Sequence, residues 1–330
     1  MRRIALEEAF WIPELGPETH PFGHLTPRNA GWVDHVQTRL IDFTDLRLQD
    51  MDAHGISVHV LSLTSPGVQA HTDLAAAVRD ARRSNEILAE TVDRHPDRFV
   101  GLAALPTQDP ARAAEELRYA IQELSLHGAL VNDHTHGRYL DDPEYDVLWA
   151  TLQELKVPLY IHPNAIPAQK LHVLTGYEYL SGGSYGWSVS VAGHALRLIY
   201  GGVFDRFPGV TVILGHMGEF LPFQTSRLDS RHANLTLANP PKLQPSEYFR
   251  RNFVITTSGV CSHSALIGAI AAVGIDRVMF AIDYPYEETG PAADFLNSVP
   301  LEPAQLDQIA FGNAERILGL NRDVADRGDA

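Results

Sequence analysis

Residues 194–223 read HALRLIYGGVFDRFPGVTVILGHMGEFLPF, and this stretch decides the fold. Its first part continues a helical pattern that spans residues 191–206. Residues 210–216, VTVILGH, then form a nearly continuous apolar run rich in β-branched side chains, which predicts a buried strand. The strand ends in His216, so an ionisable side chain directly follows a buried segment. The same order of helix, buried strand and polar strand end recurs along the chain.

This recurrence predicts an α/β protein, a (β/α)8 barrel built from parallel strands that are covered on both faces. A doubly wound open sheet is the alternative, but the GxGxxG turn of dinucleotide-binding sheets is absent after the first strand. We expect a single barrel domain over residues 1–320 and a polar C-terminal tail over residues 321–330. The predicted strands are residues 4–10, 58–63, 99–105, 129–132, 157–162, 210–216, 253–257 and 278–283. The predicted helices are residues 72–95, 110–124, 143–155, 191–206, 219–235, 264–273 and 303–318.

Two predicted connections are long. One follows the first strand over about residues 11–44, and the other follows the fifth strand over about residues 164–185 and is rich in Gly and Tyr. Long loops in compact domains are usually functional or disordered. Both are expected at the C-terminal face of the barrel, where barrel enzymes place their active sites.

The charge balance argues against two classes of partner. The chain has 26 Lys and Arg against 41 Asp and Glu, a formal net charge of −15. Nucleic acids and anionic membranes reward clustered positive charge, so neither is an expected partner. The single cysteine allows no disulfide within the chain, and no run of about 18 apolar residues is present. These features predict a cytoplasmic protein.

Ionisable residues stand at the ends of four predicted strands: Glu7 and Glu8, His162, His216, and Asp283. Unpaired charges at the ends of buried strands are costly, and a metal ion removes that cost. Glu7, His162 and Asp283 together offset the charge of a divalent cation and leave coordination positions open for water or substrate. Mixed oxygen and nitrogen ligands suit Zn²⁺, Mn²⁺ or Mg²⁺. An ion-pair network at the barrel mouth is the alternative interpretation.

His216 and Glu219 are three residues apart at the predicted start of a helix, a spacing that places both on one face. A carboxylate there can orient an imidazole and raise its basicity, although a helix-capping Glu beside a structural His is the alternative. Arg227, two turns further on, is either a residue that holds a carboxylate or a solvated helix residue. His134 and His136 have a metal-like spacing, but their Gly-terminated loop favours surface histidines.

Three stretches carry a family resemblance: IALEEAF with the following Ile-Pro at residues 4–13, residues 194–223, and FAIDYPYE at residues 280–287. The chain resembles the metal-dependent decarboxylase branch of the amidohydrolase superfamily over about residues 4–318. The likeness is to the enzymes that act on 2,3-dihydroxybenzoate, salicylate and γ-resorcylate. It implies a distorted (β/α)8 barrel with one divalent metal ion (Zn, Mn or Mg), a small aromatic carboxylic acid as substrate, and a homodimer or homotetramer.

The resemblance also implies roles for individual residues. Glu7, His162 and Asp283 match metal ligands, His216 and Glu219 match a proton-handling pair, and Arg227 and Trp187 match residues near the substrate. Ala9 stands where other branches have a second histidine ligand, a departure that matches the 2,3-dihydroxybenzoate and salicylate subgroup. The stretch that begins at Trp187 reads WSVSV and lacks the Glu-Thr pair of many relatives, which leaves the ring substituents open.

The predicted reaction is the non-oxidative loss of CO2 from an ortho-hydroxylated aromatic acid, with a proton delivered to the ring carbon that carried the carboxylate. By family likeness Asp283 is the expected acid, and His216 with Glu219 relays protons. A metal-dependent hydrolase of a lactone, imide or amide is the alternative. A barrel that has lost activity and serves as a binding partner is a third possibility.

Overall fold

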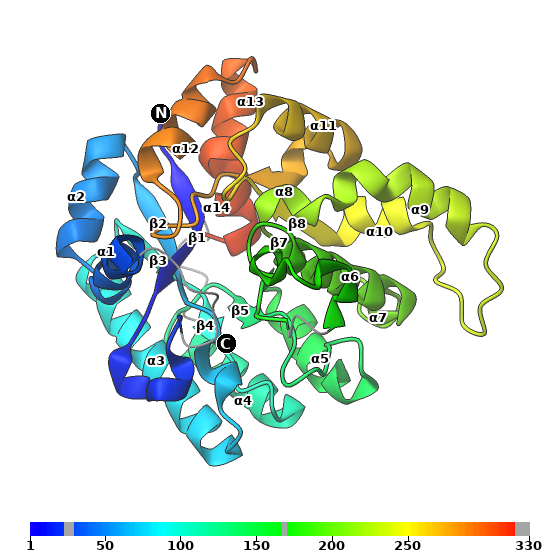
Figure 1. Ribbon diagram of the computed structural model, residues 1–330, viewed down its shortest axis with the longest axis horizontal. Coiled ribbons are helices and arrows are strands. Elements are labelled where there is room, and N and C mark those ends of the chain that lie inside the picture. Colours follow the sequence, from blue (N-terminus) through cyan, green and yellow to red (C-terminus); the bar gives the residue numbers. More distant parts are fainter. Residues whose placement is uncertain (23–29, 167–169, 321–330) are drawn as a thin grey trace, which may run out of the picture.

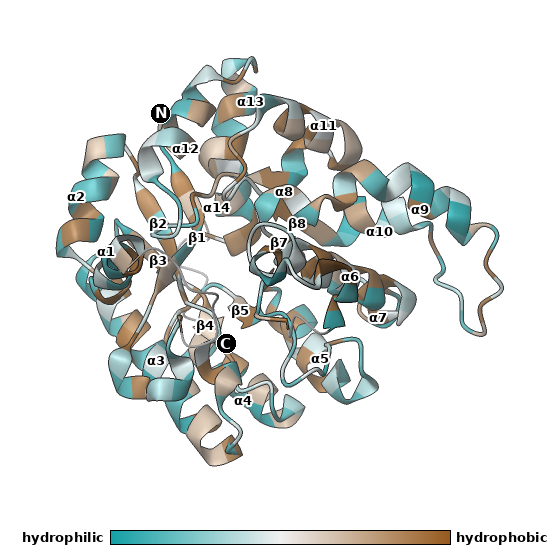
Figure 2. Ribbon diagram, in the orientation of Figure 1, coloured by the Kyte–Doolittle hydropathy of each residue, from teal (hydrophilic) through white to brown (hydrophobic). Residues whose placement is uncertain are grey.

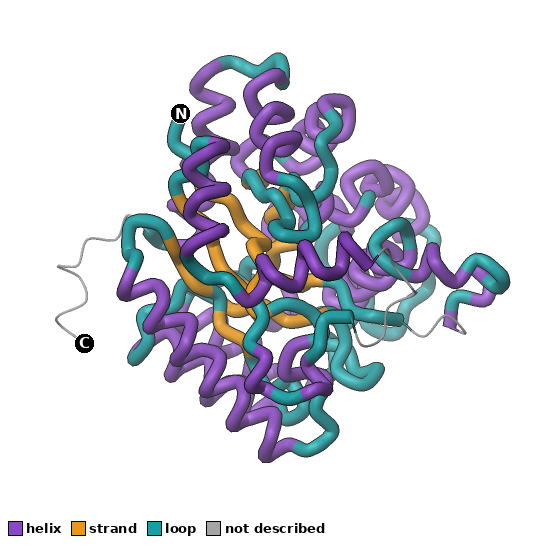
Figure 3. Tube along the Cα trace, turned by 60° about the vertical axis from the view of Figure 1, so that its left-hand side comes forward, coloured by secondary structure: helices purple, strands orange, loops and turns teal. Residues whose placement is uncertain are grey.

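The computed structural model describes residues 1–22, 30–166 and 170–320, so the predicted tail at residues 321–330 lies outside the described part. Parallel strands occupy the centre of the molecule, and helices surround them (Figures 1 and 3). The strands are β1 (Ile4–Phe10), β2 (Val58–Leu63), β3 (Phe99–Gly101), β4 (Ala103–Ala104), β5 (Ala129–Asn132), β6 (Leu159–His162), β7 (Val212–Leu214), β8 (Phe253–Thr256) and β9 (Val278–Met279).

The order of the strands follows the chain. Strands β1 to β3 form one parallel sheet and β4 to β9 a second. Strand β1 also meets the segment just after β9, since Leu6 pairs with Ala281 and its N–H donates to the Phe280 carbonyl at 3.2 Å. This contact and the sequential strand order agree with the predicted barrel, whereas a doubly wound sheet reverses its strand order at a switch point. The predicted third strand is divided at Leu102, whose N–H donates to the Leu61 carbonyl at 2.9 Å.

The helices form the outer layer of the barrel. They are α1 (Ala30–Ile41), α2 (Asp45–His54), α3 (Leu74–Arg94), α4 (Pro110–Gln122), α5 (Asp146–Leu155), α6 (Gly186–Tyr200), α7 (Val203–Arg206), α8 (His216–Glu219), α9 (Thr225–His232), α10 (Pro245–Asn252), α11 (His263–Val273), α12 (Thr289–Ser298), α13 (Pro303–Asp307) and α14 (Asn313–Leu318). The interpretation of residues 11–44 as one long connection was wrong, because α1 lies within it. Helices α2, α10 and α12 were also missed.

The core has two layers. Alternate strand residues such as Val58, Val60 and Tyr160 fill the inside of the barrel, and a larger apolar cluster lies between the strands and the helices. Figure 2 shows apolar residues along β2 and β3 and hydrophilic ones over α9. This double burial explains why the strands read as continuous apolar runs.

Two further features concern the surface. The segment between α9 and α10 extends away from the barrel (Figure 1), and it exposes Leu235 and Leu237. Among the described residues, no helix combines the length and the apolar character that crossing a bilayer requires.

Candidate active site

An irregularity in β1 brings Glu7 into the barrel. Ala5 pairs with His59 and Glu8 pairs with Leu61, so β1 has one more residue than β2 between these pairs. Glu7 has a positive φ of 67° at this bulge. A bulge re-aims a side chain. Leu6 therefore belongs to the apolar interior of the barrel, while the next side chain, Glu7, reaches polar groups at the strand ends.

The two oxygens of the Glu7 carboxylate have different surroundings. Oε2 accepts hydrogen bonds from the hydroxyls of Tyr160 and Ser258, with Thr256 Oγ1 at 3.4 Å. Oε1 is buried and has no hydrogen-bond partner among the described residues. Burial and the neighbouring Glu7 raise the pKa of Tyr160 well above its ordinary value, so this phenol stays a donor. Because a buried carboxylate oxygen without a partner is costly, Oε1 fits a role as a cation ligand.

His162 ends β6, and its Nδ1 is oriented by two acceptors. Nδ1 lies 2.8 Å from the Pro163 carbonyl and 3.0 Å from Asn132 Oδ1, an arrangement in which Nδ1–H donates. The lone pair then resides on Nε2, which lies 3.7 Å from Glu7 Oε1. Burial lowers the pKa of His162, while Glu7 opposes that shift. A neutral imidazole with a free Nε2 is the form that binds a metal ion.

His216 and Glu219 lie in a tight turn after β7. Their φ values are 47° and 53°, and Met217 and Gly218 between them also have positive φ. The prediction of one helix over residues 219–235 was therefore wrong, because this turn, a 3₁₀ turn at Leu221–Gln224 and α9 replace it. The predicted contact nevertheless forms, with His216 Nδ1 2.7 Å from Glu219 Oε1.

A close backbone approach precedes this turn. A Cβ atom at Gly215 would lie 2.7 Å from Glu7 Oε2. Only glycine therefore lets the end of β7 pass beside the Glu7 carboxylate.

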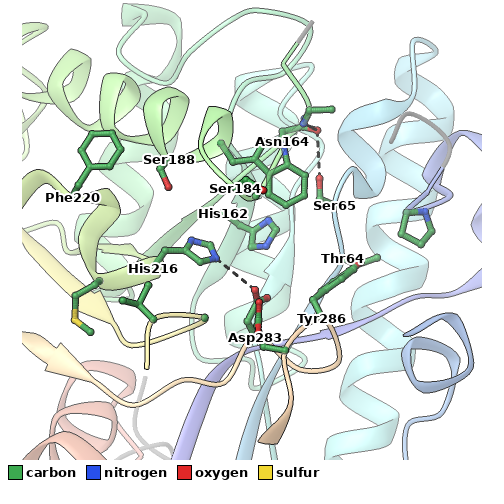
Figure 4. Close-up of a pocket in the computed structure, with 18 of the residues that line it drawn as sticks. Thr64, Ser65, His162, Asn164, Ser184, Ser188, His216, Phe220, Asp283 and Tyr286 are labelled. Atoms are coloured by element: carbon green, nitrogen blue, oxygen red, sulfur yellow. Dashed lines mark hydrogen bonds and ion pairs between the residues drawn. The ribbon is translucent and has the colours of Figure 1, made fainter. Parts of the chain in front are cut away.

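His216 Nε2 faces the two remaining carboxylates. It lies 3.5 Å from Asp283 Oδ2 and 3.7 Å from Glu7 Oε1, and Figure 4 shows His162, His216 and Asp283 directed toward one region. Burial lowers the pKa of His216, but Glu7, Glu219 and Asp283 together raise it well above its ordinary value. Burial raises the pKa of Asp283 to about 7, while His216 opposes that shift.

The donor set fits a divalent cation. Atoms of Glu7, His216 and Asp283 lie within 4.8 Å of one another. In the described part of the chain, the ion pairs of Glu7, Glu219 and Asp283 are made only with the imidazoles of His162 and His216. An excess of buried negative charge is left, which a bound cation offsets. His162 lies on β6, which does not pair with β1, and its Nε2 is 3.7 Å from Glu7 Oε1. The predicted ligand His162 therefore lies beside this group, and His216 belongs to it as well.

A cavity of about 580 Å³ opens above these residues. Its apolar wall includes Trp32, Trp187, Phe220, Phe223 and Tyr286, and its polar wall includes Thr64, Ser65, Asn164, Ser184 and Ser188. Residues from both predicted stretches, 11–44 and 164–185, line this cavity, among them Trp32 of α1 and Ser184, and Trp187 lies in its wall. A volume of this size accommodates one substituted aromatic ring with room for solvent.

Several other residues that the sequence pointed to lie outside the cavity. Arg227 is exposed on α9 and does not line it, because the break after Glu219 removes the continuous helix on which its predicted reach depended. Tyr177 and Tyr179, in the Tyr-rich connection after β6, are each 57% exposed and do not line it either. His136 is exposed and His134 is partly exposed, as expected of surface histidines.

Two residues that donate hydrogen bonds to Glu7 were not predicted from the sequence, namely Tyr160 and Ser258. Tyr160 precedes His162 by two residues on β6, so strand alternation places both side chains on the same face, and this signal was available. Ser258 lies just after the end of β8, two residues beyond Thr256, and carries no ionisable group to mark it.

Comparison with known proteins places the chain in a family. The amidohydrolase family model matches residues 23–320. The chain is 40% identical over 327 residues to the γ-resorcylate decarboxylase of Rhizobium sp. strain MTP-10005, covering 97% of this chain and 98% of that protein.

Two solved structures extend the comparison. A dihydroxybenzoic acid decarboxylase from Polaromonas sp. JS666, with bound manganese and the inhibitor 2-nitroresorcinol, has a TM-score of 0.91 at 38% identity and covers 99% of both chains. A 5-carboxyvanillate decarboxylase from Sphingomonas paucimobilis has a TM-score of 0.87 at 39% identity, covering 96% of this chain and 99% of that one.

The chain belongs to the amidohydrolase family, as its motifs predicted. The relatives confirm the predicted enzyme class, a metal-dependent decarboxylase. The manganese in the Polaromonas structure and the grouping of Glu7, His216 and Asp283 agree with the prediction of one divalent metal ion. The predicted 2,3-dihydroxybenzoate or salicylate specificity stays a prediction, because the Rhizobium relative is named for γ-resorcylate, the Sphingomonas one for 5-carboxyvanillate, and the Polaromonas one for dihydroxybenzoic acid without an isomer.

Proposed function

We propose that this enzyme removes CO2 from a small benzoate with a hydroxyl ortho to the carboxylate, of the 2,3-dihydroxybenzoate or salicylate type. The convergence of Glu7, His162, His216 and Asp283 below an aromatic-lined cavity carries this proposal. The γ-resorcylate decarboxylases support the substrate class, since γ-resorcylate (2,6-dihydroxybenzoate) also has an ortho hydroxyl.

Glu7, His162 and Asp283 hold the metal ion in this proposal. His162 suits the role because Nδ1–H donates to the Pro163 carbonyl and leaves Nε2 as a lone-pair donor. His216 suits a different role, since the Glu219 carboxylate at its Nδ1 favours the protonated ring, in which Nε2 is a donor. When bound, the ion attracts the carboxylate and the ortho oxygen of the substrate and offsets the charge of the surrounding carboxylates.

Protein side chains then supply the proton that the ring carbon receives. Asp283 donates the proton from its carboxyl group to the ring carbon, the bond from that carbon to the carboxylate breaks, and its electron pair restores the aromatic ring. His216 lies 3.5 Å from Asp283 Oδ2 and returns a proton to it, while Glu219 keeps the imidazole charged and oriented. Asp283 therefore acts as the general acid in the proposal.

The cavity wall assists by excluding water and holding the ring. Trp187 and Tyr286 present aromatic surface to the cavity. Apolar surroundings strengthen the electrostatic interactions at the acid and limit loss of the proton to solvent. A contact between Arg227 and the substrate stays a prediction, since Arg227 is exposed on α9 in the single chain.

The side chain at position 9 supports the choice of substrate subgroup. Ala9 is 6% exposed and packs with Trp11, Val36 and Leu40. It brings no metal-binding atom to the site, which leaves coordination positions for two substrate oxygens. We therefore place the 2,3-dihydroxybenzoate and salicylate type ahead of other ortho-hydroxylated acids.

Assembly into a homodimer or homotetramer is part of the same proposal. Large apolar side chains are exposed on segments beside the cavity and on the projecting segment after α9: Val173, Tyr177, Tyr179, Tyr185, Phe220, Phe223, Leu235 and Leu237. Exposed apolar surface of this kind is typical of subunit contacts. The cytoplasmic location stays a prediction.

A substrate panel tests the function. Protein stripped with a chelator and reloaded with Mn²⁺ is given salicylate, 2,3-, 2,6- and 2,4-dihydroxybenzoate and 4-hydroxybenzoate, and CO2 is measured. We expect release only from the acids with an ortho hydroxyl, and no release before reloading. Comparable turnover of 4-hydroxybenzoate would contradict the role of the ortho oxygen. Hydrolysis of a lactone without any CO2 release would instead favour the hydrolase alternative.

A further inference from the structure

Glu8 follows Glu7 in β1, but its carboxylate binds backbone amides and not the atoms of the site. It is completely buried, and Oε1 accepts the Ile282 N–H at 3.0 Å while Oε2 accepts the Tyr284 N–H at 3.0 Å. The two amides flank Asp283 on both sides. A single side chain of β1 therefore holds, through two hydrogen bonds, the backbone on both sides of a proposed metal ligand.

These hydrogen bonds lie where β1 meets the segment after β9. The Leu6 N–H donates to the Phe280 carbonyl at 3.2 Å, and the Ala9 N–H donates to the Tyr284 carbonyl at 2.7 Å. Strand β9 itself ends at Met279, so regular pairing does not continue to Asp283. Between these two backbone bonds, the Glu8 carboxylate accepts the N–H groups of Ile282 and Tyr284, which satisfies two buried backbone donors.

Both carboxylates at the metal site depend on unusual backbone at this point. Asp283 has a φ of 79° and Glu7 a φ of 67°, conformations that L-residues rarely adopt. Such conformations persist only where the surroundings hold them. The Glu8 side chain fixes residues 282–284, and its own backbone directly follows Glu7, so it connects the two strained positions.

Arg47 completes the arrangement on the outer side of the strand. It is fully buried, its Nη2 donates to the Ala9 carbonyl at 2.6 Å, and its guanidinium lies 4.6 Å from the centroid of the Tyr284 ring. Burial raises the pKa of Glu8 well above its ordinary value, while the Ile282 and Tyr284 amides and Arg47 oppose that shift. Arg47 thus joins the backbone that follows Glu8 to the ring of the residue that follows Asp283.

We propose that Glu8 is a positioning residue that sets the separation and direction of the Glu7 and Asp283 carboxylates for metal binding. The inference rests on the proposed function only in taking Glu7 and Asp283 as ligands of one ion. Glu8 does not line the cavity, so its effect reaches the ion through the backbone on either side of it.

Replacement of one acceptor tests the proposal. Glu8→Gln keeps the shape but presents an NH2 group to one of the two amides. The control is Glu116→Gln, which changes a carboxylate that is 3% exposed and accepts from Arg82 and Asn85, away from the cavity. Mn²⁺ is titrated into the metal-free proteins, free Mn²⁺ is measured by electron paramagnetic resonance, and the melting temperature is recorded without metal.

We expect Glu8→Gln to weaken Mn²⁺ binding by about 10- to 100-fold, the usual effect of removing a residue that orients metal ligands. We expect Glu116→Gln to leave Mn²⁺ binding within about twofold of wild type, because Glu116 orients no proposed ligand. A comparable melting temperature for the two metal-free variants would separate positioning from general stability. Wild-type Mn²⁺ affinity in folded Glu8→Gln would overturn the proposal.

A second measurement needs no variant. In metal-free wild-type protein, the amides of Ile282 and Tyr284 should exchange with deuterated solvent as slowly as those of β8, because Glu8 holds them before metal arrives. Rapid exchange of both amides would overturn the proposal. Neither measurement uses a substrate, so a failed panel of hydroxybenzoates would contradict the proposed function and leave this result standing.

Discussion

Nδ1 of His216 lies 2.7 Å from Oε1 of Glu219, across a turn in which both residues have positive φ. The backbone from His216 to Glu219 is left-handed, so this contact forms across a turn and not along a regular helix. The Glu219 carboxylate is buried, and its Oε2 has no hydrogen-bond partner among the described residues. Its charge therefore acts mainly on His216, which is the basis of the first prediction.

Glu219→Gln should slow turnover by about 10- to 100-fold, because an amide oxygen still accepts from Nδ1–H but no longer favours the charged imidazole. Bound metal should stay at the wild-type level, since Glu219 is not a proposed ligand. Steady-state kinetics and elemental analysis check both points. The control is Glu247→Gln, which alters an exposed capping residue of α10. Loss of metal together with turnover would move Glu219 into the metal site.

His162→Ala should weaken metal binding by about tenfold or more, because it removes the imidazole whose Nε2 faces Glu7 Oε1 at 3.7 Å. His216→Ala should keep more metal than His162→Ala if His216 handles protons. Metal content per chain after dialysis distinguishes the two imidazoles, and His134→Ala serves as a surface control. The opposite order would exchange their roles and give the ligand set Glu7, His216 and Asp283.

The sequence predicted the site through strand ends. Parallel strands end at one face, so Glu7, His162, His216 and Asp283 were expected together without any contact information. The alternation of buried strands with helices also predicted the barrel. Strands that are buried on both faces appear in the sequence as continuous apolar runs, which a local pattern detects.

Backbone irregularities could not be predicted from strand ends or apolar patterns. The bulge at Glu7 and the left-handed turn at His216 follow from long-range contacts, such as the approach of Gly215 to the Glu7 carboxylate, and no periodic pattern encodes them. The same turn ends the helical pattern that was extended to Arg227. Propensity and periodicity are local, so they fail where a tertiary contact decides the conformation.

His59 gives the protein a predicted sensitivity to acid. It is completely buried, and both ring nitrogens lack hydrogen-bond partners among the described residues. Burial, and then the charges of Arg47 and Arg98, lower its pKa well below the ordinary value of 6.5. The unfolded chain takes up a proton below about pH 6.5 and the folded chain does not, so this residue costs stability as the pH falls below that value.

The contribution of His59 should approach about 1.4 kcal/mol per pH unit below pH 6. Urea unfolding of metal-free wild type and His59→Leu at pH 5.5 and pH 8 measures it, because the variant has no imidazole to protonate. The loss of stability between the two pH values should be smaller in the variant. Equal losses would show that His59 is protonated in the folded protein.

Asp283→Asn separates two roles of one side chain. The amide keeps the shape and one coordinating oxygen but carries no acidic proton, so turnover should fall by about 10²–10⁴-fold, the usual contribution of a positioned acid. Metal content should fall less than in His162→Ala, because an amide oxygen still coordinates weakly. In deuterated water the wild-type product should carry one deuterium on the carbon that lost CO2. Near-normal turnover by the metal-loaded variant would exclude Asp283 as the acid, and His216, with Nε2 3.5 Å from Asp283 Oδ2, would then be the nearest donor to test.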